Sequence, residues 1–113
     1  MPTDLESIRH QLAVLARRKK ARVIDKPNKW RPHEVICPAT GEPFTEAGAW
    51  EYIADLLDQE HPLEEAAQEQ APDVMAYVMQ VSVLTETLYI KVRLGAGFIL
   101  GRSFHYSDKK VAT

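Results

Sequence analysis

The strongest constraint on the fold is a change of hydrophobic period in the last third of the chain. Between residues 88 and 94 the apolar positions are Leu88, Ile90, Val92 and Leu94, and the positions between them are Tyr89, Lys91 and Arg93. Strict alternation of this kind is typical of a strand that buries one face. Two further apolar stretches, over 74–83 and 98–106, flank it. We therefore predict a three-stranded antiparallel meander over residues 74–106, with Gly95–Gly97 as a hairpin loop.

The earlier part of the chain has helical spacing instead. Its first apolar residues recur every three or four positions, at Leu5, Ile8, Leu12 and Leu15. They predict a helix that begins with a capping box at Thr3 and runs to about Lys20. Thr45 is expected to cap a second helix, and Pro62 suits the start of a short third helix through about Gln68. The fold class that follows is α+β, with two to three N-terminal helices packed on a C-terminal three-stranded antiparallel meander.

A chain of 113 residues has the length of one domain, so we expect residues 1–113 to fold as a unit. The expected segments are a basic helix over 1–20, an acidic helical segment over 46–69, an antiparallel sheet over 74–106 and a frayed tail over 107–113. The stretch between the first two segments is rich in proline and irregular. There Val23-Ile24 is expected to form a short edge strand, and Trp30 to anchor the stretch to the core.

Composition places the chain among ordinary globular proteins. Its 45% apolar and 27% charged residues argue against intrinsic disorder. The single cysteine, Cys37, excludes an internal disulfide and favours a reducing compartment. No apolar run approaches the ~18 residues of a membrane helix, and the N-terminus lacks the layout of a signal peptide. We therefore expect a cytoplasmic protein with no membrane partner.

Charge is segregated along the chain. Residues 1–31 carry nine Lys/Arg and three Asp/Glu, residues 32–86 carry twelve Asp/Glu and no Lys/Arg, and residues 87–113 carry five Lys/Arg and one Asp, so the blocks contribute +6, −12 and +4 to the net −2. If the two basic ends meet in space, they form a positive surface with an acidic back. The basic cluster of the first helix, which is a candidate for binding RNA, comprises Arg17, Arg18, Lys19 and Lys20. The simpler alternative is that these cations are solvated and stabilise the helix dipole.

The register of the last hairpin decides which side chains share a face of the sheet. With Gly95–Gly97 as a three-residue loop, Leu94 faces Phe98. His105 then falls opposite Thr87, and Ser103 falls opposite Tyr89. One face of the hairpin becomes apolar, with Phe98, Leu100, Phe104 and Tyr106 on its last strand and Arg102 as the odd member. The other face collects the polar residues Tyr89, Lys91, Arg93, Ser103 and His105, together with Ile99 and Gly101.

The polar face has the residue types that metal-free RNA cleavage requires. That reaction needs a base for the 2′-hydroxyl, an acid for the leaving 5′-oxygen and cations around the phosphorus. His105 is the only residue there with an unperturbed pKa near neutrality. Lys91 and Arg93 are candidates for clamping the phosphate, Arg102 is a further candidate at the sheet edge, and Tyr89 can stack on a base or donate a proton. The alternative is a solvated sheet face on which these side chains are incidental.

Other candidate sites are weaker. His33 and Cys37 have the spacing of half a zinc site, but no CxxC or HxxxH motif accompanies them. We therefore expect no metal and no other cofactor. Cys37 has only His33 as a base that the sequence suggests, and the acidic pairs of the helical segment are typical of solvated faces.

The order of parts resembles a known family. Helices precede a meander whose middle strand contains Tyr89-Ile90-Lys91-Val92 and whose last strand contains Gly101-Arg102-Ser103-Phe104-His105. Over about residues 46–106 the chain resembles the RelE/ParE superfamily of bacterial toxins, and most nearly the motility quorum-sensing regulator toxins. The resemblance implies a helix-then-sheet fold, metal-free cleavage of mRNA and inhibition by a cognate antitoxin protein, although some members of the superfamily act on gyrase. It also implies that Lys91 binds phosphate and that Arg93, Arg102 and His105 belong to the active site.

Three functions thus remain open on the sequence. The first is a metal-free endoribonuclease toxin of a toxin–antitoxin pair, with Lys91 and His105 essential. The second is a non-catalytic interaction module that forms a homo-oligomer or binds a protein through its segregated charges. The third is a domain that binds RNA without cleaving it.

Overall fold

The computed structural model describes residues 5–25, 27–67, 75–83 and 85–107. The predicted Thr3 cap, the end of the acidic segment and residues 108–113 of the predicted tail lie outside these residues. The two α-helices are α1 (Leu5–Ala16) and α2 (Glu46–Asp58). The strands are β1 (Arg22–Ile24), β2 (Glu64–Ala67), β3 (Met75–Val83), β4 (Glu86–Leu94) and β5 (Ile99–Tyr106). Three short 3₁₀ helices, η1 (Lys19–Ala21), η2 (Pro27–Lys29) and η3 (Pro32–Glu34), lie in the N-terminal half.

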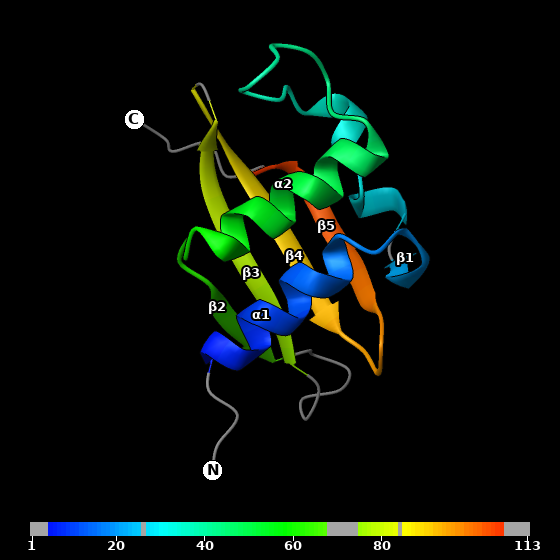
Figure 1. Cartoon of the computed structure of the whole chain (residues 1–113). Coiled ribbons are helices and arrows are strands. Elements are labelled where there is room, and N and C mark those ends of the chain that lie inside the picture. Colours follow the sequence, from blue (N-terminus) through cyan, green and yellow to red (C-terminus); the bar gives the residue numbers. More distant parts are fainter. Residues whose placement is uncertain (1–4, 26, 68–74, 84, 108–113) are drawn as a thin grey trace.

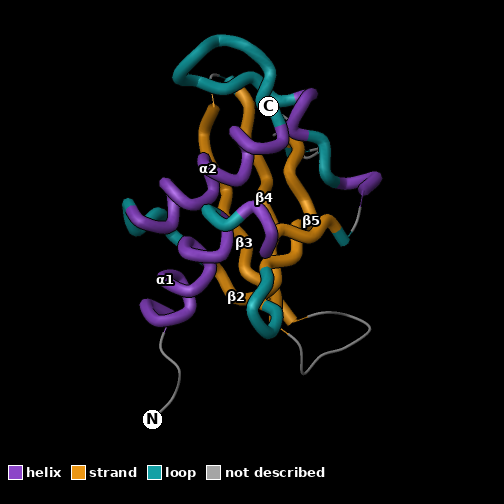
Figure 2. The backbone as a smooth tube through the Cα atoms, turned by 45° about the vertical axis from the view of Figure 1, so that its right-hand side comes forward, coloured by secondary structure: helices purple, strands orange, loops and turns teal. Residues whose placement is uncertain are grey.

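The strands form one mixed sheet in the order β1-β5-β4-β3-β2, in which β1 runs parallel to β5 and the other pairs are antiparallel. Both helices lie on the same face of this sheet, so the molecule has two layers (Figures 1 and 2). We call the helix-covered face the inner face and the opposite one the outer face.

The predicted three-stranded antiparallel meander is wrong as a fold class, because the sheet has five strands and one parallel pair. The third helix, expected from Pro62, is replaced by β2. Glu64 and Glu65 favour helices, yet they pair with Val78 and Tyr77 of β3, and such tertiary pairing overrides weak local propensity. At the other edge β1 includes the expected strand at Val23-Ile24 and is joined to β5.

The first two helices form where the apolar spacing predicts them. α1 buries Ile8, Leu12 and Leu15 but ends at Ala16 instead of about Lys20. The helix ends there because Arg18 adopts an extended backbone (φ −99°, ψ 110°). The basic cluster therefore follows the helix instead of forming its last turn.

The Thr45 cap is confirmed, and we expect it to contribute measurably to stability. The hydroxyl of Thr45 accepts a 2.9 Å hydrogen bond from the Gly48 N–H. Replacing Thr45 with alanine leaves that donor without its cap and should lower the free energy of unfolding by about 1 kcal/mol. Chemical denaturation measures the change, and Thr45→Ser, which keeps the hydroxyl, should recover most of it. A full loss in the serine variant would contradict the capping role.

An aromatic cluster joins the helices to the sheet on the inner face. Trp30 lies 4.7 Å from Trp50 and 5.5 Å from Phe104 between ring centroids, and Phe44 meets Phe104 edge-on at 5.2 Å. Gly101 makes this packing possible, because a Cβ at that position would lie 2.8 Å from the Trp30 ring. The irregular stretch is thus anchored to the core by Trp30, as predicted.

The β4–β5 hairpin has a longer loop than the predicted three residues. Leu94 pairs with Ile99, and the Gly95 N–H donates to the Phe98 carbonyl at 2.8 Å, so four residues make the turn. This pairing places Ile99 in the core cluster. Leu100, which was predicted to lie on the apolar face, lies on the outer face instead, opposite Arg93.

A β-bulge interrupts the same hairpin. Val92 pairs with Gly101, but the next residue of β4, Lys91, pairs with Ser103. Arg102 is therefore the extra residue on β5. The extra residue of a bulge reverses the alternation of side chains beyond it. The side chains that follow Arg102 therefore point to the face opposite the one they would have in a regular strand.

These two departures cancel in their effect on the faces. The predicted pairs Ser103–Tyr89 and His105–Thr87 are wrong, because His105 pairs with Tyr89 and Ser103 pairs with Lys91. The longer loop shifts the register by one residue and the bulge shifts it by another. Since a strand has a period of two, a shift of two leaves Ser103 and His105 on the outer face where they were expected.

The described part of the chain has no helix of the length and apolarity that crossing a bilayer demands.

Candidate functional site

The outer face of β4 and β5 carries polar side chains that two adjacent strands bring together. On β4 the inner positions Leu88, Ile90 and Val92 are fully buried. The residues between them, Tyr89 and Lys91, therefore point outward. Their cross-strand partners are His105 and Ser103, respectively.

Tyr89 and His105 form the centre of this face. Their ring centroids are 5.7 Å apart and the planes are inclined by 31°. His105 Nδ1 lies 2.8 Å from the Tyr106 carbonyl oxygen, which can only accept, so Nδ1 carries the hydrogen. Nε2 is then the nitrogen with the lone pair, which is the atom that a general base uses.

The environment of Tyr89 keeps its phenol protonated. Burial, and to a smaller extent the Glu64 carboxylate, raise the pKa of Tyr89 above the ordinary value of 10.0. Burial raises the pKa of Tyr77 and of Tyr52 in the same direction. At neutral pH the Tyr89 hydroxyl is therefore a hydrogen-bond donor beside the imidazole.

The raised tyrosine pKa values predict a loss of stability in alkali. Below pH 10 the phenols are neutral in both states, whereas above it the unfolded chain releases their protons more readily than the native chain. The free energy of unfolding should therefore fall as pH rises beyond 10, and Tyr89→Phe should make that fall shallower. Denaturation at a series of alkaline pH values measures the slope. An unchanged slope in Tyr89→Phe would contradict this assignment.

Cations gather in a hollow of about 240 Å³ beside this pair. The hollow is lined by Asn28, Lys29, Lys91, Arg102 and Ser103. Lys91 comes from β4 and the pair Arg102 and Ser103 from the bulged part of β5. The other two lining residues, Asn28 and Lys29, belong to η2 in the N-terminal half of the chain.

The backbone explains how η2 reaches this face. Beyond β1 the chain continues beside β5, where the Asp25 N–H donates to the Gly101 carbonyl and the Arg31 N–H donates to the Phe104 carbonyl, both at 2.9 Å. The intervening η2 turn places Lys29 at the hollow. Sequence reasoning missed Lys29 as a site residue, and the only signal was the excess of positive charge in residues 1–31.

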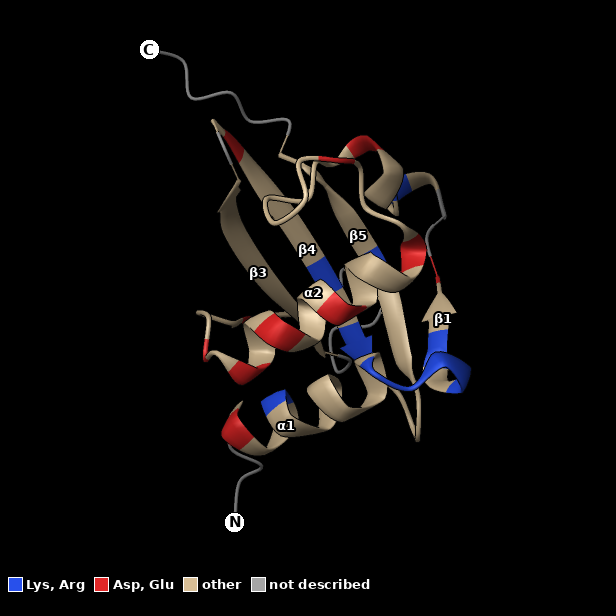
Figure 3. Cartoon of the chain, turned by 45° about the horizontal axis from the view of Figure 1, so that its top comes forward, with Lys and Arg blue, Asp and Glu red and all other residues tan. Residues whose placement is uncertain are grey.

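The two basic ends of the chain therefore meet, whereas the described acidic residues of the middle are divided between the layers. Four of them lie on α2, and Glu64, Glu65 and Glu86 lie on strands of the sheet. Lys and Arg mark β4, β5 and the region around β1, whereas Asp and Glu mark α2 (Figure 3). Within the helix layer Arg17 bonds to Asp55 and Asp58 at 2.8 Å each. Arg22 also reaches α2, through Glu51 at 3.4 Å.

Arg102 is ion-paired with Asp25, which reduces the positive charge of the hollow. If single-stranded RNA binds at this hollow, Asp25→Asn should tighten that binding by about two- to fivefold at low salt. The gain should shrink as salt is added, because the interaction is screened. Fluorescence anisotropy measures it, and Asp55→Asn on α2 is the matched control. Equal gains in both variants would contradict a local effect at the hollow.

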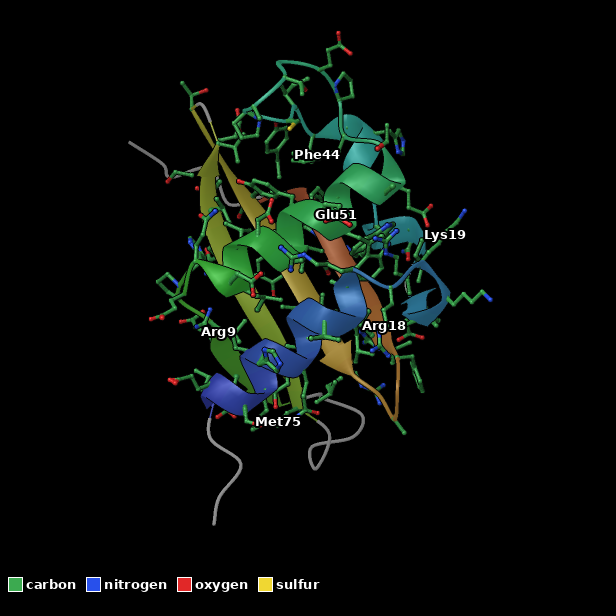
Figure 4. All side chains as sticks on the ribbon, in the orientation of Figure 1. Arg9, Arg18, Lys19, Phe44, Glu51 and Met75 are labelled. Carbon is green, nitrogen blue, oxygen red and sulfur yellow. The ribbon has the colours of Figure 1, made fainter. Side chains whose placement is uncertain are left out.

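The remaining predicted site residues do not line this hollow. Arg93 lies on the same face of β4, opposite Leu100, and its buried Nε has no hydrogen-bond partner among the described residues. In the basic cluster Arg17 is held by the carboxylates of α2. Arg18 and Lys19 are exposed beside β1, where Lys19 extends away from the body (Figure 4). Lys20 is exposed in η1, so the basic cluster does not line the hollow.

The weaker candidates gain no support. Across residues 5–25, 27–67, 75–83 and 85–107, His, Cys, Asp and Glu form no group of three or more that could hold a metal ion. Cys37 is a half-buried thiol in the loop before α2.

No protein-family model matches the chain, and neither a curated protein nor a solved structure is significantly similar to it.

Proposed function

We propose that this protein is an endoribonuclease that cleaves single-stranded RNA without a metal ion, of the kind found in the RelE/ParE toxins. The observation that carries the proposal is the Tyr89–His105 pair next to a hollow lined by Lys29, Lys91 and Arg102. A proton acceptor, a proton donor and cations are thereby combined on the outer face of the sheet. These are the groups that transesterification of a phosphodiester requires.

The geometry supports a role for each group. Nε2 of His105 would take the proton of the 2′-hydroxyl, and the resulting oxygen would attack the adjacent phosphorus. The bond from phosphorus to the 5′-oxygen would break, and the leaving oxygen would take the proton of the Tyr89 hydroxyl. Lys91 and Arg102 would stabilise the negative charge that grows on the phosphate. The products are a 2′,3′-cyclic phosphate and a 5′-hydroxyl.

The test is incubation of the full chain with unstructured RNA in the presence of a chelator. We expect fragments whose ends are a cyclic phosphate and a 5′-hydroxyl, because the attacking oxygen belongs to the RNA itself. An all-deoxy strand should resist cleavage. Fragments with a 5′-phosphate would contradict the mechanism, and intact RNA would favour a non-catalytic module that binds RNA or a protein.

A toxin of this class would also arrest growth. Induction of the chain in a bacterial host should slow growth and fragment total RNA, and a cognate antitoxin protein would suppress both effects. Growth arrest with intact RNA would contradict the nuclease and favour another target, such as gyrase.

A further inference from the structure

A second hollow, of about 180 Å³, adjoins the first. Its lining comprises Lys29, Arg31, Glu34, His105 and Tyr106. Lys29 lines both hollows. Ser103 lines the first hollow and His105 lines the second, and these two residues are only two positions apart on β5. That separation is about 6.6 Å along a strand. The two hollows are thus close enough to hold neighbouring parts of one nucleotide.

The two hollows differ in chemistry. The first offers cations and neutral hydrogen-bonding groups, which suits a phosphate. The second also has the Glu34 carboxylate, which would repel a phosphate, and the imidazole ring of His105. Tyr106 is the next residue of β5, and its side chain packs against the core instead. An aromatic ring together with a donor and an acceptor is what proteins use to hold an unstacked RNA base.

Arg31 and Glu34 are arranged to read the edge of such a base. Arg31 Nε donates to the Asn28 carbonyl at 2.8 Å, which fixes the guanidinium. Arg31 Nη1 and Glu34 Oε1 are 3.8 Å apart, which is too far for a hydrogen bond. The Arg31 guanidinium can therefore donate to a further polar group and the Glu34 carboxylate can accept from one, and about half of each side chain is exposed.

We infer that this second hollow is a nucleobase subsite that prefers bases with an exocyclic amino group over uracil. The Glu34 carboxylate can accept from the amino group of adenine, cytosine or guanine, while Arg31 donates to an acceptor atom of the same base. Uracil has no amino group, and two carbonyl oxygens flank its single N–H. Its N–H can donate to one oxygen of the Glu34 carboxylate, but a uracil carbonyl then lies beside the other carboxylate oxygen and repels it, so uracil binds less favourably than an amino-bearing base. This inference rests on the proposed function in that it requires RNA to lie on the outer face.

The test measures binding, so it does not depend on cleavage. Short 2′-O-methyl oligonucleotides of adenosine, cytidine and uridine cannot undergo the transesterification, and fluorescence anisotropy gives their dissociation constants. We expect the adenosine and cytidine strands to bind about tenfold more tightly than the uridine strand. Glu34→Gln should erase or reverse this preference, because the amide can donate to a uracil carbonyl. Glu42→Gln, an exposed carboxylate in the loop before α2, should leave it unchanged.

The outcomes separate this inference from the nuclease proposal. Equal affinity for all three strands, a preference for uridine, or no binding at all would overturn the base subsite, even if natural RNA is cleaved. A preference for amino-bearing bases that Glu34→Gln removes would support it, even if no RNA is cleaved. A preference that survives Glu34→Gln would overturn the assignment to this hollow.

Discussion

Replacing His105 with alanine should slow RNA cleavage by a factor of roughly 10²–10⁴, which is the usual contribution of a general base. The reason is geometric: Nδ1 of His105 is bonded to the Tyr106 carbonyl, so Nε2 is available to take the 2′-hydroxyl proton. The loss should appear in kcat, with little change in the affinity for a non-cleavable RNA. Quantified product formation from a labelled RNA measures it.

Two controls make this result specific. His10→Ala removes an exposed imidazole on α1 and should leave the rate unchanged. Circular dichroism should show that His105→Ala remains folded, because its half-exposed side chain is not part of the core cluster. Wild-type cleavage by a folded His105→Ala variant would remove the imidazole from the mechanism.

The largest stability effect is expected at Trp50. Its side chain is fully buried and stacks near Trp30 at 4.7 Å, so truncation to alanine leaves a cavity between α2 and the sheet. We expect Trp50→Ala to lower the free energy of unfolding by about 3–5 kcal/mol. Denaturant titration of Trp50→Ala measures the loss, with Trp50→Phe as a milder variant that should lose less.

A substitution at an exposed residue serves as the control for the loss of stability in Trp50→Ala. His10→Ala on α1 should stay within about 0.5 kcal/mol of wild type. A loss of less than 1 kcal/mol in Trp50→Ala would show that the aromatic cluster does not hold the helices to the sheet. If Trp50→Ala does not fold at all, the intermediate loss in Trp50→Phe still tests the same packing.

Local pattern was sufficient to predict the helices and the long strands. The spacing of Ile8, Leu12 and Leu15 gives the buried side of α1, and Thr45 gives the start of α2. The alternation around Lys91 gives β4 and its outward face. In each case the signal lies within one element, where spacing alone determines burial.

Features that depend on distant partners could not be predicted. β2 is a strand only because β3 lies beside it, although Glu64 and Glu65 prefer helices. The parallel pairing of β1 with β5 joins residues that are far apart in sequence, and this pairing leads the chain to Lys29. The bulge at Arg102 likewise belongs to the pairing of β5 with β4, which no local pattern encodes.

The central claim is that RNA binds to the outer face of β4 and β5. Amide chemical shifts recorded by NMR during titration with a 2′-O-methyl RNA test it residue by residue. We predict that the largest shifts occur at Lys29, Tyr89, Lys91, Ser103 and His105. Shifts confined to α1, α2 and the exposed basic residues Arg18–Lys20 would contradict it.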